Sequence, residues 1–160
     1  MRLAIISDTH MPRGARRLPD ACVAELEAAD AILHCGDWAR PEVVTQIAGY
    51  GPPVHGIRGN VDDPGLGLPA RIEVDFDGVR IGMVHDPGPA GGRLDRLRGW
   101  FPDAAAVLFG HTHMPQHEQR EDFQIFNPGS PTERRRAPHH TMGIAEVADG
   151  RVAFTLKELG

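Results

Sequence analysis

Short apolar runs recur along the first two thirds of the chain, and each is continuous rather than alternating with polar residues. Runs of this kind are typical of strands that are buried on both faces of a sheet. We therefore expect buried strands over Leu3–Ser7, Ala31–Cys35, Val54–Ile57, Ile81–Val84 and Ala106–Phe109. Between these runs the pattern predicts helices over Asp20–Ala29, Pro41–Ala48 and Arg93–Phe101. The second helix has proline in its first turn, where proline is favoured.

The last third of the chain favours short strands joined by tight turns. Strands are expected over His117–Glu121, Phe123–Phe126, Met142–Val147 and Val152–Leu156. The turn Ala148-Asp149-Gly150 predicts a hairpin between the last two of these strands. Asp77-Gly78 predicts a second hairpin, between Arg71–Phe76 and Val79–Val84.

The order of the elements, alternating strands and helices followed by a group of strands, predicts the α/β class. The expected architecture is a four-layer αββα sandwich, in which two mixed sheets pack together and helices flank them. A chain of 160 residues is long enough to bury a full core, so we expect a single domain over residues 1–160.

Composition and charge narrow the class of partner. The formal net charge of −5 argues against a general nucleic-acid binder, which would usually be basic. No apolar run approaches the roughly 20 residues of a membrane span, and the N-terminus lacks a secretory signal. We therefore expect a cytoplasmic protein with no membrane partner. Cys22 and Cys35 are too few for a disulfide framework and are expected to be reduced and buried.

Arginines cluster at two places despite the negative net charge. The first cluster contains Arg13, Arg16 and Arg17, and the second is the run 134–136. Either cluster can be a solvated turn, or can lie beside an anionic substrate. Arg13, three residues past His10, is the candidate for a substrate contact.

Side chains that bind metal ions follow five of the predicted strands. The candidates are Asp8, His10, Asp37, Asn60, His85, His111 and His113. In open α/β sheets, ligands bind at the carboxyl ends of the strands, so separate segments can deliver these groups to one edge. Residues two apart in an extended segment point to the same side. Asp8 and His10, and likewise His111 and His113, can therefore each place two ligands on one face.

This mixture of carboxylate, imidazole and amide groups suits first-row ions such as Mn²⁺, Fe²⁺, Ni²⁺ or Zn²⁺ and suits Ca²⁺ poorly. Seven ligands exceed the needs of one catalytic ion, so we expect two divalent ions about 3.5–4 Å apart, with Mn²⁺ preferred. One carboxylate must then bridge the ions, and Asp37 is the candidate. Gly36, Gly59 and Gly110 each precede a candidate ligand, where close backbone approach or an unusual φ is useful.

Each motif taken alone has an ordinary structural explanation. An aspartate at a strand end often caps the following turn, and Gly36-Asp37 and Gly59-Asn60 are common turn dipeptides. Together, and each at a strand end, the five motifs favour a metal centre. The other histidines lack such a pattern: His34 lies inside an apolar run and is expected in the core. Structural or exposed positions are expected for the remaining ones, His55, His117, His139 and His140.

As a set, these motifs resemble the calcineurin-like metallophosphoesterases. The matching segments are Ser7-Asp8-Thr9-His10, His34-Cys35-Gly36-Asp37, Arg58-Gly59-Asn60-Val61-Asp62, Val84-His85 and Gly110-His111-Thr112-His113. Asn127-Pro128-Gly129-Ser130 is similar to a segment of the small bacterial and archaeal phosphodiesterase branch. The resemblance spans about residues 3 to 156, which is nearly the whole chain.

The resemblance implies how the ligands divide between the two ions. Asp8, His10, Asp37 and His113 would hold one ion, and Asp37, Asn60, His85 and His111 would hold the other. A hydroxide that bridges the ions would attack phosphorus, while the ions offset charge on the phosphate oxygens. Asp37, Asn60 and His111 are the residues we expect to matter most for catalysis.

Three departures from the family pattern shape the expected activity. Val61 stands where many relatives have a histidine that protonates the leaving group, and valine cannot donate a proton. Because general acid catalysis typically contributes 10²–10⁴-fold, monoesters with poor leaving groups should react slowly. His85-Asp86-Pro87 replaces a His-Gly-His motif, so only His85 is carried over. Arg40 replaces the last aspartate of the pattern found in protein phosphatases, which argues against a phosphoprotein substrate.

The leading hypothesis is therefore a phosphodiesterase that acts on a small phosphoester, with nucleotides among the candidates. A nucleotidase or pyrophosphohydrolase on the same metal site is the alternative enzyme. A non-catalytic scaffold is the third hypothesis, because the retromer complex contains a protein-binding subunit of this fold. Association into a homo-oligomer stays open. Loops 63–69 and 86–92, rich in Pro and Gly, either form the substrate rim or are rigid turns.

Overall fold

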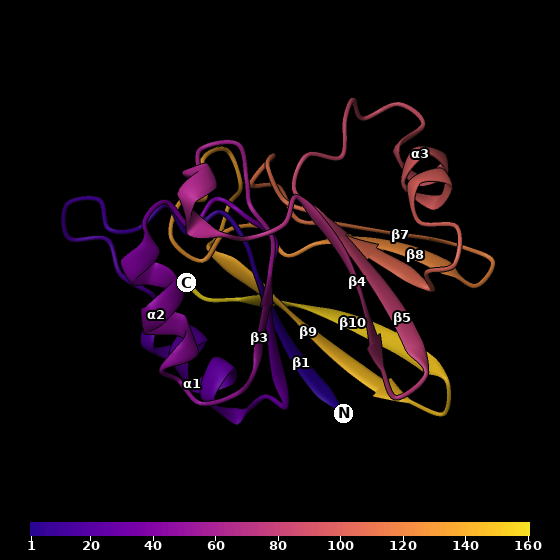
Figure 1. The fold of residues 1–160 in the computed structure, drawn as a ribbon, viewed down its shortest axis with the longest axis horizontal. Coiled ribbons are helices and arrows are strands. Elements are labelled where there is room, and N and C mark those ends of the chain that lie inside the picture. The colour runs from indigo at the N-terminus through magenta and orange to yellow at the C-terminus, as the bar shows by residue number, and fades with distance from the viewer.

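Two five-stranded sheets face each other in the computed structural model, which describes residues 1–160 (Figure 1). The first sheet has the order β10-β9-β1-β2-β3, and the second has the order β4-β5-β6-β8-β7. The first sheet contains β1 (Arg2–Ile6), β2 (Ala31–His34), β3 (Val54–Gly56), β9 (Thr141–Ala148) and β10 (Arg151–Glu158). The second contains β4 (Arg71–Phe76), β5 (Val79–Val84), β6 (Ala106–Leu108), β7 (Gln116–Arg120) and β8 (Phe123–Asn127).

Helices cover the outer face of each sheet, which completes four layers. They are α1 (Asp20–Ala28), α2 (Pro41–Ala48) and α3 (Arg93–Trp100), with a short 3₁₀ turn, η1, over Pro64–Leu66. In Figure 1, α1 and α2 lie together beside the first sheet, and α3 lies against the second. No helix combines the length and the apolar character that a membrane span requires.

Three hydrophobic clusters correspond to the three interfaces between the layers. The largest lies between the two sheets and includes Leu33, Ile81 and Phe126. A second contains residues of α1 and α2 together with the outward-facing side chains of β1 and β2, and a third packs α3 on β6 and β8. The expected αββα sandwich of two mixed sheets is therefore confirmed.

The predicted hairpins are present, and one predicted strand is less buried than expected. Asp77 and Gly78 both have positive φ, 50° and 86°, as a tight two-residue hairpin turn requires. Asp149 and Gly150 turn the chain between β9 and β10 in the same way. The strand β3 is only half-buried, because it lies at the edge of its sheet.

Parallel pairing in both sheets brings the ends of distant strands to one edge of the sandwich. β1, β2 and β3 run parallel, and so do β5, β6 and β8. The segments that follow these strands contact one another across the two sheets: the backbone N–H of His111, after β6, donates to the carboxylate of Asp8, after β1. This carboxyl edge carries the predicted ligands.

Candidate metal centre

The seven predicted ligands all lie at the carboxyl edge, each just after a strand. Asp8 and His10 follow β1, and single residues follow the next three strands: Asp37 after β2, Asn60 after β3 and His85 after β5. His111 and His113 follow β6. Two groups of carboxylate and imidazole atoms converge closely enough to share an ion: Asp8, His10 and His113, and Asp8, Asp37 and His85.

The first group surrounds one oxygen of Asp8. The Nε2 atom of His113 lies 3.4 Å from Asp8 Oδ1, and the Nε2 atom of His10 lies 3.8 Å from the same oxygen. Asp37 also reaches this group, with its Oδ2 atom 3.5 Å from His10 Nε2.

The second group lies on the other side of Asp37. The Nε2 atom of His85 is 3.1 Å from Asp37 Oδ2 and 3.0 Å from Asn60 Oδ1. Asn60 Oδ1 is in turn 3.1 Å from His111 Nδ1. One oxygen of Asp37 therefore faces imidazoles of both groups. Asp8 Oδ1, 3.7 Å from His85 Nε2, also lies near both groups, which the family resemblance does not imply.

Three buried polar atoms of the centre have no hydrogen-bond partner: Asp8 Oδ1, His10 Nε2 and His113 Nε2. Each such atom destabilises the fold by about 1–3 kcal/mol, so a folded protein rarely leaves several together without a function. A carboxylate oxygen and two imidazole nitrogens are donors that first-row divalent ions prefer. The residues present therefore fit a divalent metal ion.

The backbone adopts an unusual conformation at most of the candidate ligands. φ is positive at Asp8 (56°), His10 (45°), Asp37 (60°), His111 (74°) and His113 (61°). Residues other than glycine rarely adopt this region, and such positions cluster at functional sites. The local conformation is therefore consistent with a site selected for chemistry rather than for stability.

Two glycines let the ligand segments approach one another. A Cβ atom on Gly59 would lie 2.0 Å from Asp37 Oδ1, and one on Gly110 would lie 2.6 Å from Asp8 Oδ2. No side chain fits at either position without displacing a candidate ligand. The close approach expected at these glycines is present.

Hydrogen bonds outside the centre orient its ligands. His85 Nδ1 lies 2.7 Å from the carbonyl oxygen of Cys35, and His113 Nδ1 contacts the carbonyl oxygen of Glu133. A ring nitrogen that faces a carbonyl oxygen donates a proton to it, so in the neutral form of each ring Nε2 carries the lone pair that a metal ion would bind. Asp8 Oδ2 accepts a hydrogen bond from Ser7 Oγ (2.6 Å), which leaves Oδ1 for the centre.

Asp62 is a structural carboxylate that the sequence motifs did not single out as functional. It accepts backbone N–H groups from Asp37 (2.9 Å), Ala39 (2.9 Å) and Gly59 (2.8 Å). These bonds fasten the segment after β2 to the segment after β3. The only sequence signal is its place in the Arg58–Asp62 motif, which does not reveal its partners.

The Asn127–Ser130 segment forms hydrogen bonds to the backbone of two loops that carry candidate ligands. Asn127 Nδ2 donates to the carbonyl oxygen of Gly110 (3.2 Å), and Ser130 Oγ donates to that of Asp8 (2.8 Å). Both side chains are buried. The segment therefore holds the backbone of two ligand loops rather than contributing ligands itself.

Burial and charge act in opposite directions on the ionisable groups of the centre. Burial alone would raise the pKa of Asp37, but His85 and the N–H of Val61 lower it below its usual value. For His85, burial lowers the pKa, and the nearby carboxylates of Asp37 and Asp8 more than offset this and raise it. Burial lowers the pKa of His113, which favours the neutral imidazole that a metal ion binds.

The arginine clusters lie outside the centre, but the first is linked to it through Glu133. Arg13 and Arg16 lie 3.7 Å and 3.6 Å from Glu133 Oε1, and Glu133 Oε2 lies 3.7 Å from His10 Nε2. The Arg13 side chain is 73% exposed. Glu133 gave no sequence signal, because it stands in a charged run. Residues 134–136 are exposed.

The remaining histidines do not join the centre. His34 is buried, stacks on Trp38 with ring centroids 3.7 Å apart, and lies 3.1 Å from Thr9 Oγ1. Burial holds its pKa well below the usual value, so it is a neutral core residue as predicted. His55, His117, His139 and His140 lie on or near the surface. Cys22 and Cys35 are free and buried, as expected, and burial raises the pKa of Cys22 to about 12.

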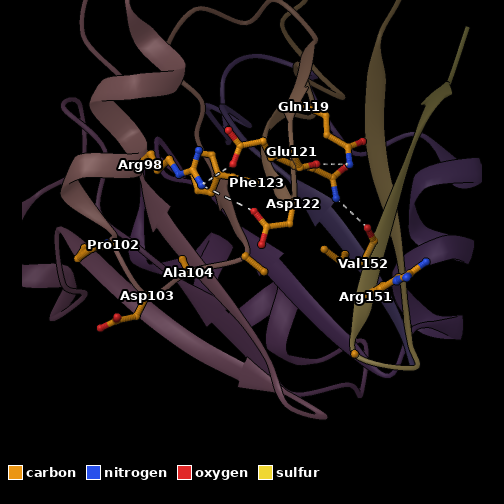
Figure 2. A pocket seen from close by; sticks show the side chains of 13 residues that line it. Arg98, Pro102, Asp103, Ala104, Gln119, Glu121, Asp122, Phe123, Arg151 and Val152 are labelled. Carbon is orange, nitrogen blue, oxygen red and sulfur yellow. Dashed lines mark hydrogen bonds and ion pairs between the residues drawn. The ribbon is translucent and has the colours of Figure 1, made fainter.

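The largest cavity, about 650 Å³, lies at the opposite ends of the strands (Figure 2). It is lined by the segment before β6, the β7–β8 turn and the start of β10, and contains no predicted ligand. Three of its charged residues form ion pairs at the surface: Arg98 lies 3.6 Å from Glu121 and 3.7 Å from Asp122. A smaller cavity of about 490 Å³ borders the candidate metal centre and includes Asn60 and His85 in its lining.

Comparison with known proteins identifies relatives. The model of the calcineurin-like phosphoesterase superfamily domain matches residues 1–150. A probable metallophosphoesterase of Methanothermobacter thermautotrophicus is 33% identical over 135 residues, which cover 82% of this chain and 78% of that protein. A phosphodiesterase of Methanocaldococcus jannaschii is 22% identical over 144 residues, covering 81% of this chain and 83% of that protein.

Among solved structures, a Vps29 variant from Entamoeba histolytica has a TM-score of 0.80, and the alignment covers all of both chains. The two sequences are 20% identical, so the similarity concerns the fold alone.

Proposed function

Because the chain belongs to the calcineurin-like phosphoesterase superfamily, we propose that it is a phosphodiesterase that hydrolyses small phosphodiesters with two divalent ions bound across Asp37. The observation that carries this proposal is the convergence of unpartnered buried ligand atoms at the carboxyl edge. The relative named as a phosphodiesterase supports the choice of reaction.

In the proposed centre, each of two ions would have its own ligands and would share one carboxylate with the other. Asp8, His10, Asp37 and His113 would hold one ion, and Asp37, Asn60, His85 and His111 would hold the other. The position of Asp37 Oδ2, 3.5 Å from His10 and 3.1 Å from His85, supports its role as the shared ligand. The donor set suits Mn²⁺, with Ni²⁺, Fe²⁺ and Zn²⁺ as alternatives.

Such ions, when bound, activate water as a nucleophile and offset the charge on the phosphate oxygens. The protein positions its own groups for this chemistry. Asp62 and the carbonyl groups behind His85 and His113 fix the ligands before substrate arrives. Asn60 is exposed and His111 is half-buried, so a phosphoester can reach both residues from solvent.

Val61 bears on which leaving groups the proposed centre favours. Its backbone N–H donates to Asp37 Oδ1 (3.0 Å), which places the residue at the centre, and the residue is 49% exposed. An isopropyl group cannot protonate a leaving oxygen. Substrates whose leaving groups are acidic enough to depart unprotonated should therefore react best.

A substrate panel with Mn²⁺-loaded protein tests the proposal. The panel compares bis(p-nitrophenyl) phosphate, p-nitrophenyl phosphate and a dinucleoside polyphosphate. We expect the diester to have the highest kcat/KM and chelation by EDTA to abolish its hydrolysis. A clear preference for the polyphosphate would favour a pyrophosphohydrolase instead, and no hydrolysis with any first-row ion would exclude the proposed enzyme.

A further inference from the structure

The cavity that borders the metal centre has two arginines in its wall. Arg58 and Arg71 line the cavity of about 490 Å³ together with Asn60 and His85, two of the proposed metal ligands. A phosphoester bound at the centre therefore has this cavity as its immediate neighbour on the Asn60 side. The charges of the residues that line the cavity determine which groups of a substrate can bind there.

A backbone hydrogen bond fixes the position of Arg58, while its guanidinium forms no hydrogen bond or ion pair within the protein. The backbone N–H of Arg58 donates to the carbonyl oxygen of Pro69 (2.8 Å), which closes the loop over residues 59–69. The residue is half-buried, and its side chain takes part in no ion pair or hydrogen bond. The loop thus fixes an arginine whose charge is available to a ligand.

Arg71, the first residue of β4, is restrained by an aromatic ring instead of a carboxylate. Its Cζ atom lies 4.2 Å from the centroid of the Trp100 ring and 5.9 Å from that of Phe101. A cation–π contact orients a guanidinium without neutralising it. Arg71 forms no ion pair, so its planar donor groups stay free to bind a phosphate in bidentate fashion.

Two carboxylates also line this cavity, and neither one pairs with the arginines. The Asp62 carboxylate is buried and is occupied by three backbone N–H groups. Asp86 is exposed, and its Oδ1 atom accepts the N–H of Gly88 (2.9 Å). Because neither carboxylate forms an ion pair with Arg58 or Arg71, the guanidinium donors of both arginines remain available to an anionic ligand.

We infer that Arg58 and Arg71 form a subsite for a second phosphate group of the substrate. The preferred substrate is then a phosphodiester that carries an additional phosphate on the arm lying in this cavity. The inference rests on the proposed phosphodiesterase function for the position of the scissile group, and it adds the class of substrate.

A matched pair of substrates tests the subsite. The p-nitrophenyl ester of thymidine 5′-phosphate is compared with the same compound bearing a 3′-phosphate, using Mn²⁺-loaded protein. We expect the 3′-phosphate to raise kcat/KM by roughly tenfold or more at low salt and by less at high salt, as charge-assisted bonds at a partly exposed site should. In the Arg58→Gln/Arg71→Gln double variant, the ratio of the two kcat/KM values should fall to about one.

The matched control is Arg80→Gln, which removes an exposed arginine of the same β4–β5 hairpin that does not line the cavity. It should keep the wild-type ratio. A ratio that stays within about twofold of the wild-type value in the double variant would overturn the subsite and leave the phosphodiesterase proposal intact.

A binding measurement without metal separates the subsite from the enzyme. Trp100 is partly exposed beside Arg71, whereas Trp38 is fully buried. Inorganic phosphate added in EDTA should therefore change tryptophan fluorescence saturably in the wild type, but not in Trp100→Phe or in the double variant. Saturable binding in a protein that hydrolyses no diester would retain the subsite and reject the proposed function. A phosphate response that persists in the double variant would reject the subsite.

Discussion

Charged side chains cluster at both ends of the sandwich, but they are buried at one end and exposed at the other. At the carboxyl edge, carboxylates and imidazoles are buried, and three of their atoms have no hydrogen-bond partner. Around the larger cavity at the other end, Arg98 pairs with exposed acidic groups of the β7–β8 turn (Figure 2). If the proposed centre is the functional site, cavity size does not mark that site in this protein. The better marker is buried polar groups that the fold itself leaves unsatisfied.

The backbone shows the same contrast. Five of the seven proposed ligands adopt positive φ, whereas the positive φ values beside the larger cavity belong to ordinary turns at Glu121, Asp149 and Gly150. Strain at a turn is explained by the reversal of the chain. Positive φ at candidate ligands that follow three different strands is typical of a functional site.

The largest expected effect comes from the shared carboxylate. Asp37→Asn keeps the size of the side chain but removes the charge proposed to bridge two ions. We expect kcat/KM for bis(p-nitrophenyl) phosphate to fall by at least about 10³-fold, because metal ions contribute several kcal/mol to such reactions. The far-ultraviolet circular dichroism spectrum should be unchanged. Full activity in this variant would contradict the bridging role.

Asp62→Ala should show the next largest effect and affect stability as well as activity. It removes the acceptor of three buried or partly buried N–H groups, so we expect a loss of about 2–4 kcal/mol in the free energy of unfolding, measured with urea. Metal affinity should fall by roughly 10–100-fold because the ligand loops separate. Asp63→Ala is the matched control, since that exposed carboxylate accepts only the N–H of Gly65. Equal stability of the two variants would contradict the assigned role.

Val61→His should change selectivity more than total activity. A histidine there can protonate the leaving group, so we expect the ratio of monoester to diester kcat/KM to rise by about tenfold or more. The measurement compares phenyl phosphate, a monoester whose leaving group is poorer than p-nitrophenolate, with bis(p-nitrophenyl) phosphate on the same preparation. An unchanged ratio would show that residue 61 does not face the leaving group.

The smallest effect is expected at the opposite end. Arg98→Ala breaks two exposed ion pairs, and exposed pairs contribute only about 0–1 kcal/mol. We expect a change of less than about 1 kcal/mol in unfolding free energy and less than about twofold in kcat/KM. A loss of activity comparable to that of Asp37→Asn would place function at the larger cavity and reverse the comparison.

The fold was predicted well from the sequence, and the candidate ligands lie at the expected edge, because both depend on local patterns. Continuous apolar runs marked the strands, and polar residues directly after them lie at one edge since parallel strands share a direction. The half-burial of β3 was not predictable locally, because it depends on which strand takes the edge of the sheet.

Residues that act through distant partners were not identified from sequence. Asp62 binds the N–H of Ala39, 23 positions away, and Glu133 approaches His10 from the other end of the chain. The position of Asp8 near both ligand groups likewise depends on how two sheets pack. Such contacts are set by tertiary structure, and no spacing rule within one segment encodes them.

The number of bound ions and their coupling test the central claim most directly. Protein loaded with Mn²⁺ and freed of excess ion should contain two ions per chain, measured by elemental analysis, and its electron paramagnetic resonance spectrum should show a spin-coupled pair, as a bridged centre about 3.5–4 Å across requires. Asp37→Asn should lose the coupling. One ion or fewer per chain, or two magnetically isolated ions, would contradict a centre bridged by Asp37.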